Sequence, residues 1–227
     1  MSSKEAPADN EGVLLLRDVM STNVVNIPSK TPVTEARKIM EAHRVRHLPV
    51  VDKGKLVGLI TRDTLDKTGP SQLTTFSMHE ISYLLSSIKV ADVMKKDLAV
   101  LPPTATVEEA VALARRRRVD SILVVDKGHL LGIATSNDFF DKVANPILGI
   151  DKPGVRLTVR DCCRQALDLE KVMTIIGRFE GTIISIGSAP RPETDKLDLI
   201  VHLDSPNVAY IVESLKAAGY QVQERAR

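Results

Sequence analysis

The chain contains the same segment twice. Residues 18–65 align with residues 92–139 without a gap, at a constant offset of 74 positions, and 17 of the 48 aligned pairs are identical. Two copies are too few for a solenoid, in which repeats stack on one another in a row. The duplication therefore predicts two similar units related by a pseudo-twofold axis, with equivalent clefts between them.

Each copy predicts the same order of elements. A helical pattern of apolar residues opens at residue 33 in one copy and at residue 107 in the other. An apolar, β-branched run follows, at 48–51 or 122–125, and then an Asp-Lys-Gly turn whose glycine suits a positive φ. A second strand ends at Thr61 or Thr135, where a short helix begins. Each unit is predicted as strand–helix–strand–strand–helix.

The C-terminal third predicts a separate small domain. From Val155 to Gln223 the patterns run strand, helix, strand, strand, helix, strand, which is the ferredoxin-like βαββαβ motif. We predict a disordered N-terminus at 1–12, the two units at 13–68 and 91–144, a loop and connector helix at 69–90, a linker at 145–153 and the C-terminal domain at 154–227. The fold class is α+β.

Charge and hydropathy argue against several kinds of partner. The net charge of +2 over 227 residues does not demand a nucleic acid or an anionic membrane. No apolar run approaches 18 residues, and the polar N-terminus lacks the apolar core of a signal peptide. We expect a cytoplasmic protein with no nucleic-acid or membrane partner.

The sequence shows no spacing that is typical of catalysis or metal binding. Its five histidines form no metal-ligand pattern, and no nucleophile triad, paired carboxylates or phosphate loop is present. His47 is expected to form a hydrogen bond at a cleft edge. Cys162 and Cys163 are adjacent, and neighbouring cysteines do not easily bridge each other. We therefore expect no enzyme, no metal and no required cofactor.

Three motifs make the repeats resemble CBS domains. They are Asp-Val-Met at 18–20 and 92–94, the Pro-Val-Val-Asp segment at 49–52, and Gly-hydrophobic-hydrophobic-Thr at 58–61 and 132–135. The pair resembles a Bateman module, and the C-terminal segment resembles an ACT domain without the glycine turn that the family carries after its first strand. With the predicted connector helix, the whole chain resembles the acetoin utilisation protein AcuB family.

The resemblance implies that an adenosyl nucleotide, such as AMP, ATP or S-adenosylmethionine, binds between the repeats. The family motif continues as Thr/Ser-x-x-Asp, in which the threonine caps a helix whose free N–H groups favour phosphate. The aspartate takes the ribose hydroxyls. Repeat two keeps Thr135 and Asp138, whereas repeat one has Thr64 at the aspartate position and Asp63 one residue earlier. One residue is a turn of about 100° on a helix, so Asp63 does not simply replace the missing aspartate.

The two clefts are therefore predicted to differ, and the resemblance implies that adenine lies between apolar residues of the repeats in each. The better site is predicted from Thr135, Asn137, Asp138, Val25 and Val45. The degenerate site, which is empty, altered or specialised, is predicted from Thr61, Asp63, Thr64, Ala99, Val119 and Arg46. A threonine followed three residues later by an acid is also a helix-capping pattern, so a purely structural role stays open. The arginine run at 115–118 suits a solvated helix C-terminus or a phosphate contact.

The resemblance implies a non-enzymatic, homodimeric regulator. Ligand binding would shift the geometry of the repeats, and the change would pass to the ACT-like domain, a regulated enzyme or a transcription factor. One alternative is a dimerisation and interaction scaffold of acetoin or carbon metabolism that binds no nucleotide. The other is an amino-acid sensor that acts through the ACT-like domain.

Overall fold

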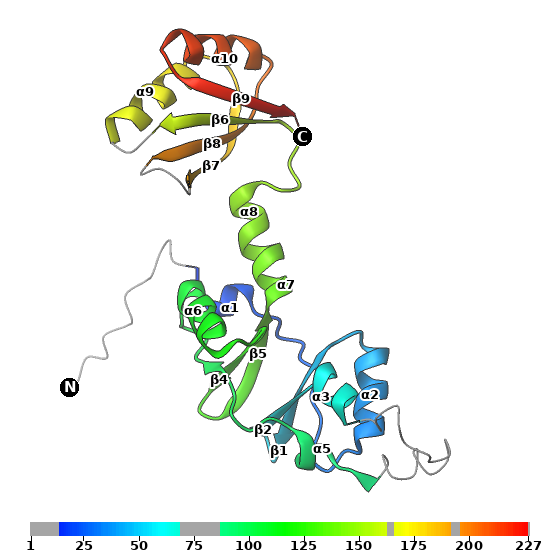
Figure 1. The fold of residues 1–227 in the computed structure, drawn as a ribbon. Coiled ribbons are helices and arrows are strands. Elements are labelled where there is room, and N and C mark those ends of the chain that lie inside the picture. The colour runs from blue at the N-terminus through cyan, green and yellow to red at the C-terminus, as the bar shows by residue number, and fades with distance from the viewer. Residues whose placement is uncertain (1–13, 69–86, 163–165, 192–195, 227) are drawn as a thin grey trace, which may run out of the picture. The chain divides into compact units, whose positions relative to one another are not determined.

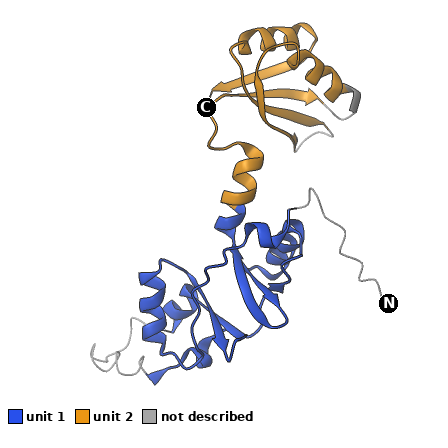
Figure 2. Ribbon diagram, turned by 180° about the vertical axis from the view of Figure 1, so that it is seen from behind, with its two compact units in different colours: residues 1–139 blue, residues 140–227 orange. Residues whose placement is uncertain are grey.

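The computed structural model describes residues 14–68, 87–162, 166–191 and 196–226 (Figure 1). The chain divides into two compact units, Met1–Phe139 and Phe140–Arg227, which Figure 2 colours separately. The first unit holds both repeats. The predicted N-terminal segment and residues 69–86 of the predicted connector lie outside the described residues.

Both repeats have the same order of elements. The first consists of α1 (Leu16–Val19), α2 (Val33–Ala42), β1 (His47–Asp52), β2 (Lys55–Thr61) and α3 (Arg62–Lys67). The second consists of α5 (Val90–Val93), β3 (Val100–Leu101), α6 (Val107–Arg117), β4 (Ser121–Asp126), β5 (His129–Thr135) and α7 (Ser136–Phe139). The first strand of each unit is short. Strand β3 of the second repeat has two residues, and its counterpart in the first repeat is a single parallel bridge between Ile27 and Val50.

Local sequence explains the hairpins and the helix ends. Strands β1 and β2 pair antiparallel, as do β4 and β5, and each hairpin turns at a Lys-Gly pair. Lys53 and Gly54 have φ of 51° and 78°, so the predicted positive φ at the turn glycine is confirmed. Helix α6 begins with a capping box, in which the Thr106 hydroxyl accepts from the Glu109 N–H at 3.1 Å.

The leading segments of the two repeats are exchanged between them. The Leu16 N–H donates to the Ala105 carbonyl at 2.8 Å, and its counterpart, the Val90 N–H, donates to Thr31 at 2.8 Å. Isolated antiparallel bridges join Leu59 to Lys95 and, at the equivalent positions, Ser21 to Ile133. These reciprocal contacts tie the repeats into one unit.

The exchange explains two of the three sequence motifs. A Cβ on Gly58 would lie 2.3 Å from the Met94 Sδ, and one on Gly132 would lie 2.5 Å from the Met20 Sδ. Each methionine ends the Asp-Val-Met motif of one repeat, and each glycine opens the Gly-hydrophobic-hydrophobic-Thr motif of the other. Glycine is needed because the backbone and the methionine approach so closely.

The second unit has the predicted order of elements. After the π-helical turn η1 (Phe140–Ala144) and α8 (Asn145–Leu148) come β6 (Val155–Cys162), α9 (Ala166–Ile176), β7 (Thr182–Pro190), β8 (Leu197–Asp204), α10 (Val208–Ala217) and β9 (Gln221–Ala226). The sheet is antiparallel with strand order β7-β8-β6-β9. Apolar residues of α9 and α10 share one core with Leu157, Val201 and Leu203 of the central strands. Membership of the ACT family stays a prediction.

Two expectations for this unit differ from the structure. The predicted linker at 145–153 begins with helix α8, because Pro146 lies in the first turn, where a proline is tolerated, and Gly149 ends the helix with φ of 59°. The expectation that the adjacent cysteines do not bridge is wrong for Cys162, which is disulfide-bonded. Residue 163 lies outside the described residues.

Candidate functional site

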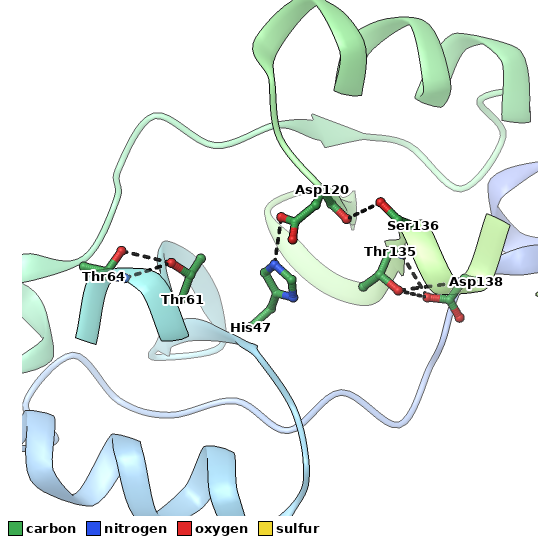
Figure 3. A network of polar contacts seen from close by, with 7 residues as sticks. All are labelled: His47, Thr61, Thr64, Asp120, Thr135, Ser136 and Asp138. Atoms are coloured by element: carbon green, nitrogen blue, oxygen red, sulfur yellow. Dashed lines mark hydrogen bonds and ion pairs between the residues drawn. The ribbon is translucent and has the colours of Figure 1, made fainter. Parts of the chain in front are cut away.

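Thr61 caps helix α3 at the end of strand β2. Its Oγ1 accepts a hydrogen bond from the Thr64 N–H at 3.3 Å and lies 3.0 Å from the Thr64 hydroxyl (Figure 3). The neighbouring Asp63 carboxylate is exposed and has no ion-pair or hydrogen-bond partner within the described residues. The one-residue displacement in the sequence therefore leaves Asp63 outside the cap.

Thr135 forms a tighter cap with Asp138. The Asp138 Oδ2 accepts from the Thr135 N–H at 2.9 Å and from the Thr135 hydroxyl at 2.7 Å (Figure 3). The Asp138 Oδ1 accepts from the Ser21 hydroxyl, on the other repeat, at 2.9 Å. Asp138 thus joins the two repeats as well as capping α7, which agrees with the capping interpretation of this motif.

A cavity of about 460 Å³ lies at the other cleft, between strand β2 of the first repeat and the second repeat. We call it the Thr61 cleft. Its lining includes five of the six residues that the sequence placed in the degenerate site: Arg46, Thr61, Asp63, Ala99 and Val119. The sixth, Thr64, does not line the cavity and instead bonds Thr61.

The residues of the predicted better site do not line this cavity. Val25 and Val45 are half-buried and pack against the core of the first repeat, and Asn137 is exposed on α7. Thr135 and Asp138 are half-buried and bonded to each other. The ranking of the two sites stays a prediction.

Several charged residues of the Thr61 cleft are paired. Lining residue Asp97 forms an ion pair with Arg117, and the His47 Nε2 lies 2.9 Å from the Asp120 Oδ1. His47 therefore forms a hydrogen bond at the cleft edge, as predicted. Arg62 approaches Glu41 at 3.9 Å.

Three cations of the cleft have no such pair. Arg46, Lys95 and Arg118 line the cavity, and no carboxylate of the described residues lies within 4.0 Å of them. The sequence favoured a solvated helix C-terminus or a phosphate contact for the arginine run that includes Arg118, and it did not single out Lys95. Lys95 reaches the cleft through its bridge to Leu59, a contact between distant segments that no sequence motif marks.

The Asp120 carboxyl is ionised more readily than usual. Burial raises its pKa, but the charge of His47 and the hydrogen bond from it outweigh burial and hold the pKa below its usual value. The charge of Arg46 acts in the same direction from beyond ion-pair distance. Asp120 is therefore an anion at neutral pH, and it offsets part of the positive charge of the cleft.

The described residues contain no cluster of three or more His, Cys, Asp or Glu side chains that could hold a metal ion. Among the same residues, no helix is long and apolar enough to span a membrane.

Comparison with known proteins identifies the repeats. The family model of the CBS domain matches residues 16–68 and 90–145. An inosine-5′-monophosphate dehydrogenase of Methanocaldococcus jannaschii is 32% identical over 182 residues, which cover 78% of this chain and 32% of that protein. The chain spans 26% and 29% of two further dehydrogenases of this name, from Thermoplasma acidophilum and Korarchaeum cryptofilum.

The chain is also similar to solved structures. A Vibrio cholerae protein assigned as the acetoin utilization protein AcuB is 25% identical, with a TM-score of 0.50 over 61% of this chain and 96% of that one. The CBS domain pair of protein MJ0100, crystallised with 5′-methylthioadenosine and S-adenosyl-L-methionine, is also 25% identical, with a TM-score of 0.49 over 62% of this chain and 99% of that one. The matched ranges coincide with the two exchanged repeats described above, so the chain carries a tandem pair of CBS domains.

Proposed function

We propose that this protein is a non-enzymatic regulator that binds an adenosyl nucleotide (AMP, ATP or S-adenosylmethionine) between its two CBS domains. The observation that carries the proposal is the Thr61 cleft, whose lining brings Thr61 and Asp63 of one repeat together with Ala99 and Val119 of the other. At about 460 Å³, the cavity lies within the usual range for small-molecule pockets.

The composition of the cleft suits such a ligand. Ala99 is buried and Val119 half-buried, and Leu59 and Leu123 add apolar surface on which a purine ring can pack. The Asp63 carboxylate is free to accept hydrogen bonds from ribose hydroxyls.

Binding at this place can be coupled to conformation. Each repeat contributes to the lining, so a ligand that contacts both favours the arrangement in which those contacts are made. A ligand shifts the equilibrium only as far as its affinities for the two arrangements differ. The change would reach a partner or the C-terminal domain, and the resemblance implies that the protein acts as a cytoplasmic homodimer.

Isothermal titration of the full-length protein with AMP, ATP and S-adenosylmethionine tests the proposal. We expect saturable binding of at least one of them, with weaker binding in Val119→Trp, which narrows the Thr61 cleft. The exposed Val111, on the same repeat but outside the lining, provides the control Val111→Trp. Absence of binding by all three ligands at millimolar concentration would refute the proposal.

One observation favours the scaffold alternative. The Asp138 oxygens accept from Thr135 and Ser21, so in the second cleft the motif already has partners within the protein. If no adenosyl ligand binds and the chain is recovered from native lysate with a specific enzyme or transcription factor, the CBS pair serves as an interaction module. Sedimentation equilibrium at several concentrations would measure the expected dimer in either case.

A further inference from the structure

The two clefts differ in charge at equivalent positions. Lys95 lies where the other repeat has Ser21, and Arg62 lies where the other repeat has Ser136. Arg46 aligns with Asp120, whereas Arg118 aligns with another arginine, Arg44. At Arg46, Arg62 and Lys95 the Thr61 cleft therefore carries cations that the fold itself does not require, because the equivalent positions hold neutral or acidic residues.

The ion pairs at the cleft do not neutralise these cations, so their positive charge is available to a ligand. Of the three lining carboxylates, Asp97 is bonded to Arg117 and Asp120 to His47. Within the part of the chain that the structure describes, Asp63 alone of the three stays unpaired, against the three unpaired cations Arg46, Lys95 and Arg118. Unpaired guanidinium and ammonium groups around a cavity attract an anion, and they form their strongest hydrogen bonds with phosphate or carboxylate oxygens.

We propose that Arg46, Lys95 and Arg118 make the Thr61 cleft selective for a phosphate-bearing adenosyl nucleotide over an uncharged or cationic one. The inference rests on the proposed function and narrows its ligand class. Apolar lining residues and Asp63 supply contacts that adenosine, AMP, ATP and S-adenosylmethionine share, because all four carry the adenosine group. Selection therefore falls to the cations, which attract phosphate and repel the sulfonium of S-adenosylmethionine.

Titration of the wild-type protein with the four ligands gives the first test. We expect affinity to rise from adenosine to AMP to ATP at the Thr61 cleft, with S-adenosylmethionine weaker than ATP. The affinity for ATP is expected to fall as NaCl rises from about 0.05 to 0.5 M, while that for adenosine stays constant, because salt screens charge interactions. The titration curves are fitted with a model of two binding sites. The site whose affinity falls in Val119→Trp is assigned to the Thr61 cleft.

Charge removal gives the second test. Lys95 is exposed, so Lys95→Gln is expected to fold normally and to weaken ATP binding about five- to tenfold at this site, with adenosine affinity unchanged. Arg118→Gln is expected to act alike. Arg44→Gln is the matched control, because Arg44 and Arg118 share the left-handed backbone, with φ of 53° and 52°, while Arg44 lies outside the lining.

The outcomes separate this inference from the function on which it rests. Equal affinity for adenosine and ATP, or an equal loss of both in Lys95→Gln, would refute charge selection while nucleotide binding stands. Failure of all four ligands to bind would refute both. A loss of ATP binding in Arg44→Gln as large as in Arg118→Gln would show that the effect comes from the helix end and would overturn the assignment.

Discussion

The imidazole Nε2 of His47, on the first repeat, lies 2.9 Å from the Asp120 Oδ1, on the second. His47 is the first residue of β1, and Asp120 immediately precedes β4. Both residues line the Thr61 cleft. In Figure 3 the His47–Asp120 contact is seen with the Thr61–Thr64 pair on one side and the Thr135–Asp138 pair on the other. The backbone carbonyl of Asp120 also accepts a hydrogen bond from the Ser136 N–H at 3.1 Å. Asp120 therefore bonds His47 on the first repeat and the residue that follows Thr135 on the second.

Replacement of Asp120 by asparagine is expected to strengthen anion binding. The variant removes one of the carboxylates that offset the cations of the cleft and keeps the side-chain shape. We expect ATP affinity to rise severalfold, while the free energy of unfolding falls by less than about 1 kcal/mol, because the Asp120 carboxylate is exposed and such an ion pair contributes little. Calorimetric titration and urea unfolding measure the two effects. A decrease in ATP affinity would mean that Asp120 positions His47 for the ligand and does not compete with it.

The close approach of the exchanged segments predicts unequal costs for two glycine substitutions. A Cβ on Gly132 would lie 2.9 Å from the Ser21 carbonyl oxygen, whereas the nearest backbone atom to a Cβ on Gly58 is 3.3 Å away. A backbone atom yields less easily than a methionine side chain. We expect Gly132→Ala to lower the free energy of unfolding by about 1–3 kcal/mol and Gly58→Ala by less.

Gly187→Ala provides the control for these two variants. A Cβ there meets no atom of the described residues within 4 Å, and the φ of Gly187 is not positive, so stability is expected to stay unchanged or to rise slightly. Chemical denaturation of the three variants gives the comparison. Equal losses for Gly58→Ala and Gly132→Ala would contradict the steric explanation.

The hairpins and the repeat order could be predicted from the sequence because their causes are local. Periodicity, the Asp-Lys-Gly turns and the offset of 74 positions are readable without the partner segment. The exchange of leading segments could not be predicted in this way. The steric clash that a Cβ on Gly58 would cause depends on Met94, and no local sequence pattern links the two residues.

The site could be predicted only in part, for a related reason. The resemblance to CBS domains, carried across the copies by the offset, assigned Thr61, Ala99 and Val119 to one cleft, and the structure gathers all three around one cavity. It did not reveal which cations stay unpaired, since that depends on whether Arg117 or Arg118 reaches Asp97. Arg117 is the last residue of α6 and bonds Asp97, whereas Arg118 is the left-handed residue that follows the helix and lines the cavity.

The two aspartates of the nucleotide motifs are expected to affect different sites. The sequence predicts that Asp138→Ala weakens the tighter adenosyl site far more than Asp63→Ala does. Asp138 also caps α7 and bonds Ser21, so its loss is expected to lower stability, whereas Asp63 forms no side-chain hydrogen bond or ion pair within the described residues. Titration with a parallel melting curve separates binding from stability. Equal losses of affinity in the two variants would refute the predicted ranking.

Asp52 is expected to contribute stability that acid removes. The side chain and the backbone N–H of Ser29 hydrogen-bond its carboxylate, the N–H at 3.0 Å, and these bonds lower the pKa of Asp52. A carboxyl whose pKa is lower in the folded state stabilises the protein above its unfolded pKa of about 3.9 and loses this effect as pH falls through the folded value. Asp52→Asn is therefore expected to lower Tm at pH 7, with the difference from wild type shrinking below about pH 4.

Asp126→Asn is the matched control for Asp52. Asp126 occupies the equivalent position in the second repeat, but the equivalent of Ser29 is Pro103, which has no N–H to donate. We expect its Tm to follow that of the wild type from pH 3 to pH 7. A similar loss of Tm in both variants would mean that the effect comes from the change in net charge and not from the contact with Ser29.

A buried histidine in the second unit gives the last prediction. The His202 side chain is fully buried on β8, and neither ring nitrogen has a hydrogen-bond partner among the described residues. A Cβ on Gly149 or Gly154 would lie 3.0 Å from Nδ1 or 3.2 Å from Nε2, so backbone packs closely around the ring. A buried polar group without a partner costs about 1–3 kcal/mol, so His202→Leu is expected to raise the free energy of unfolding.

His202→Ala separates polarity from volume, because it removes the same nitrogens and leaves a cavity. We expect it to be less stable than His202→Leu by about 2–5 kcal/mol, the cost of such a cavity. Urea unfolding at pH 7 and pH 5 measures the three proteins. A leucine variant less stable than the wild type would mean that the ring nitrogens are bonded in solution, and the packing around Gly149 and Gly154 would then have to open to admit the partner.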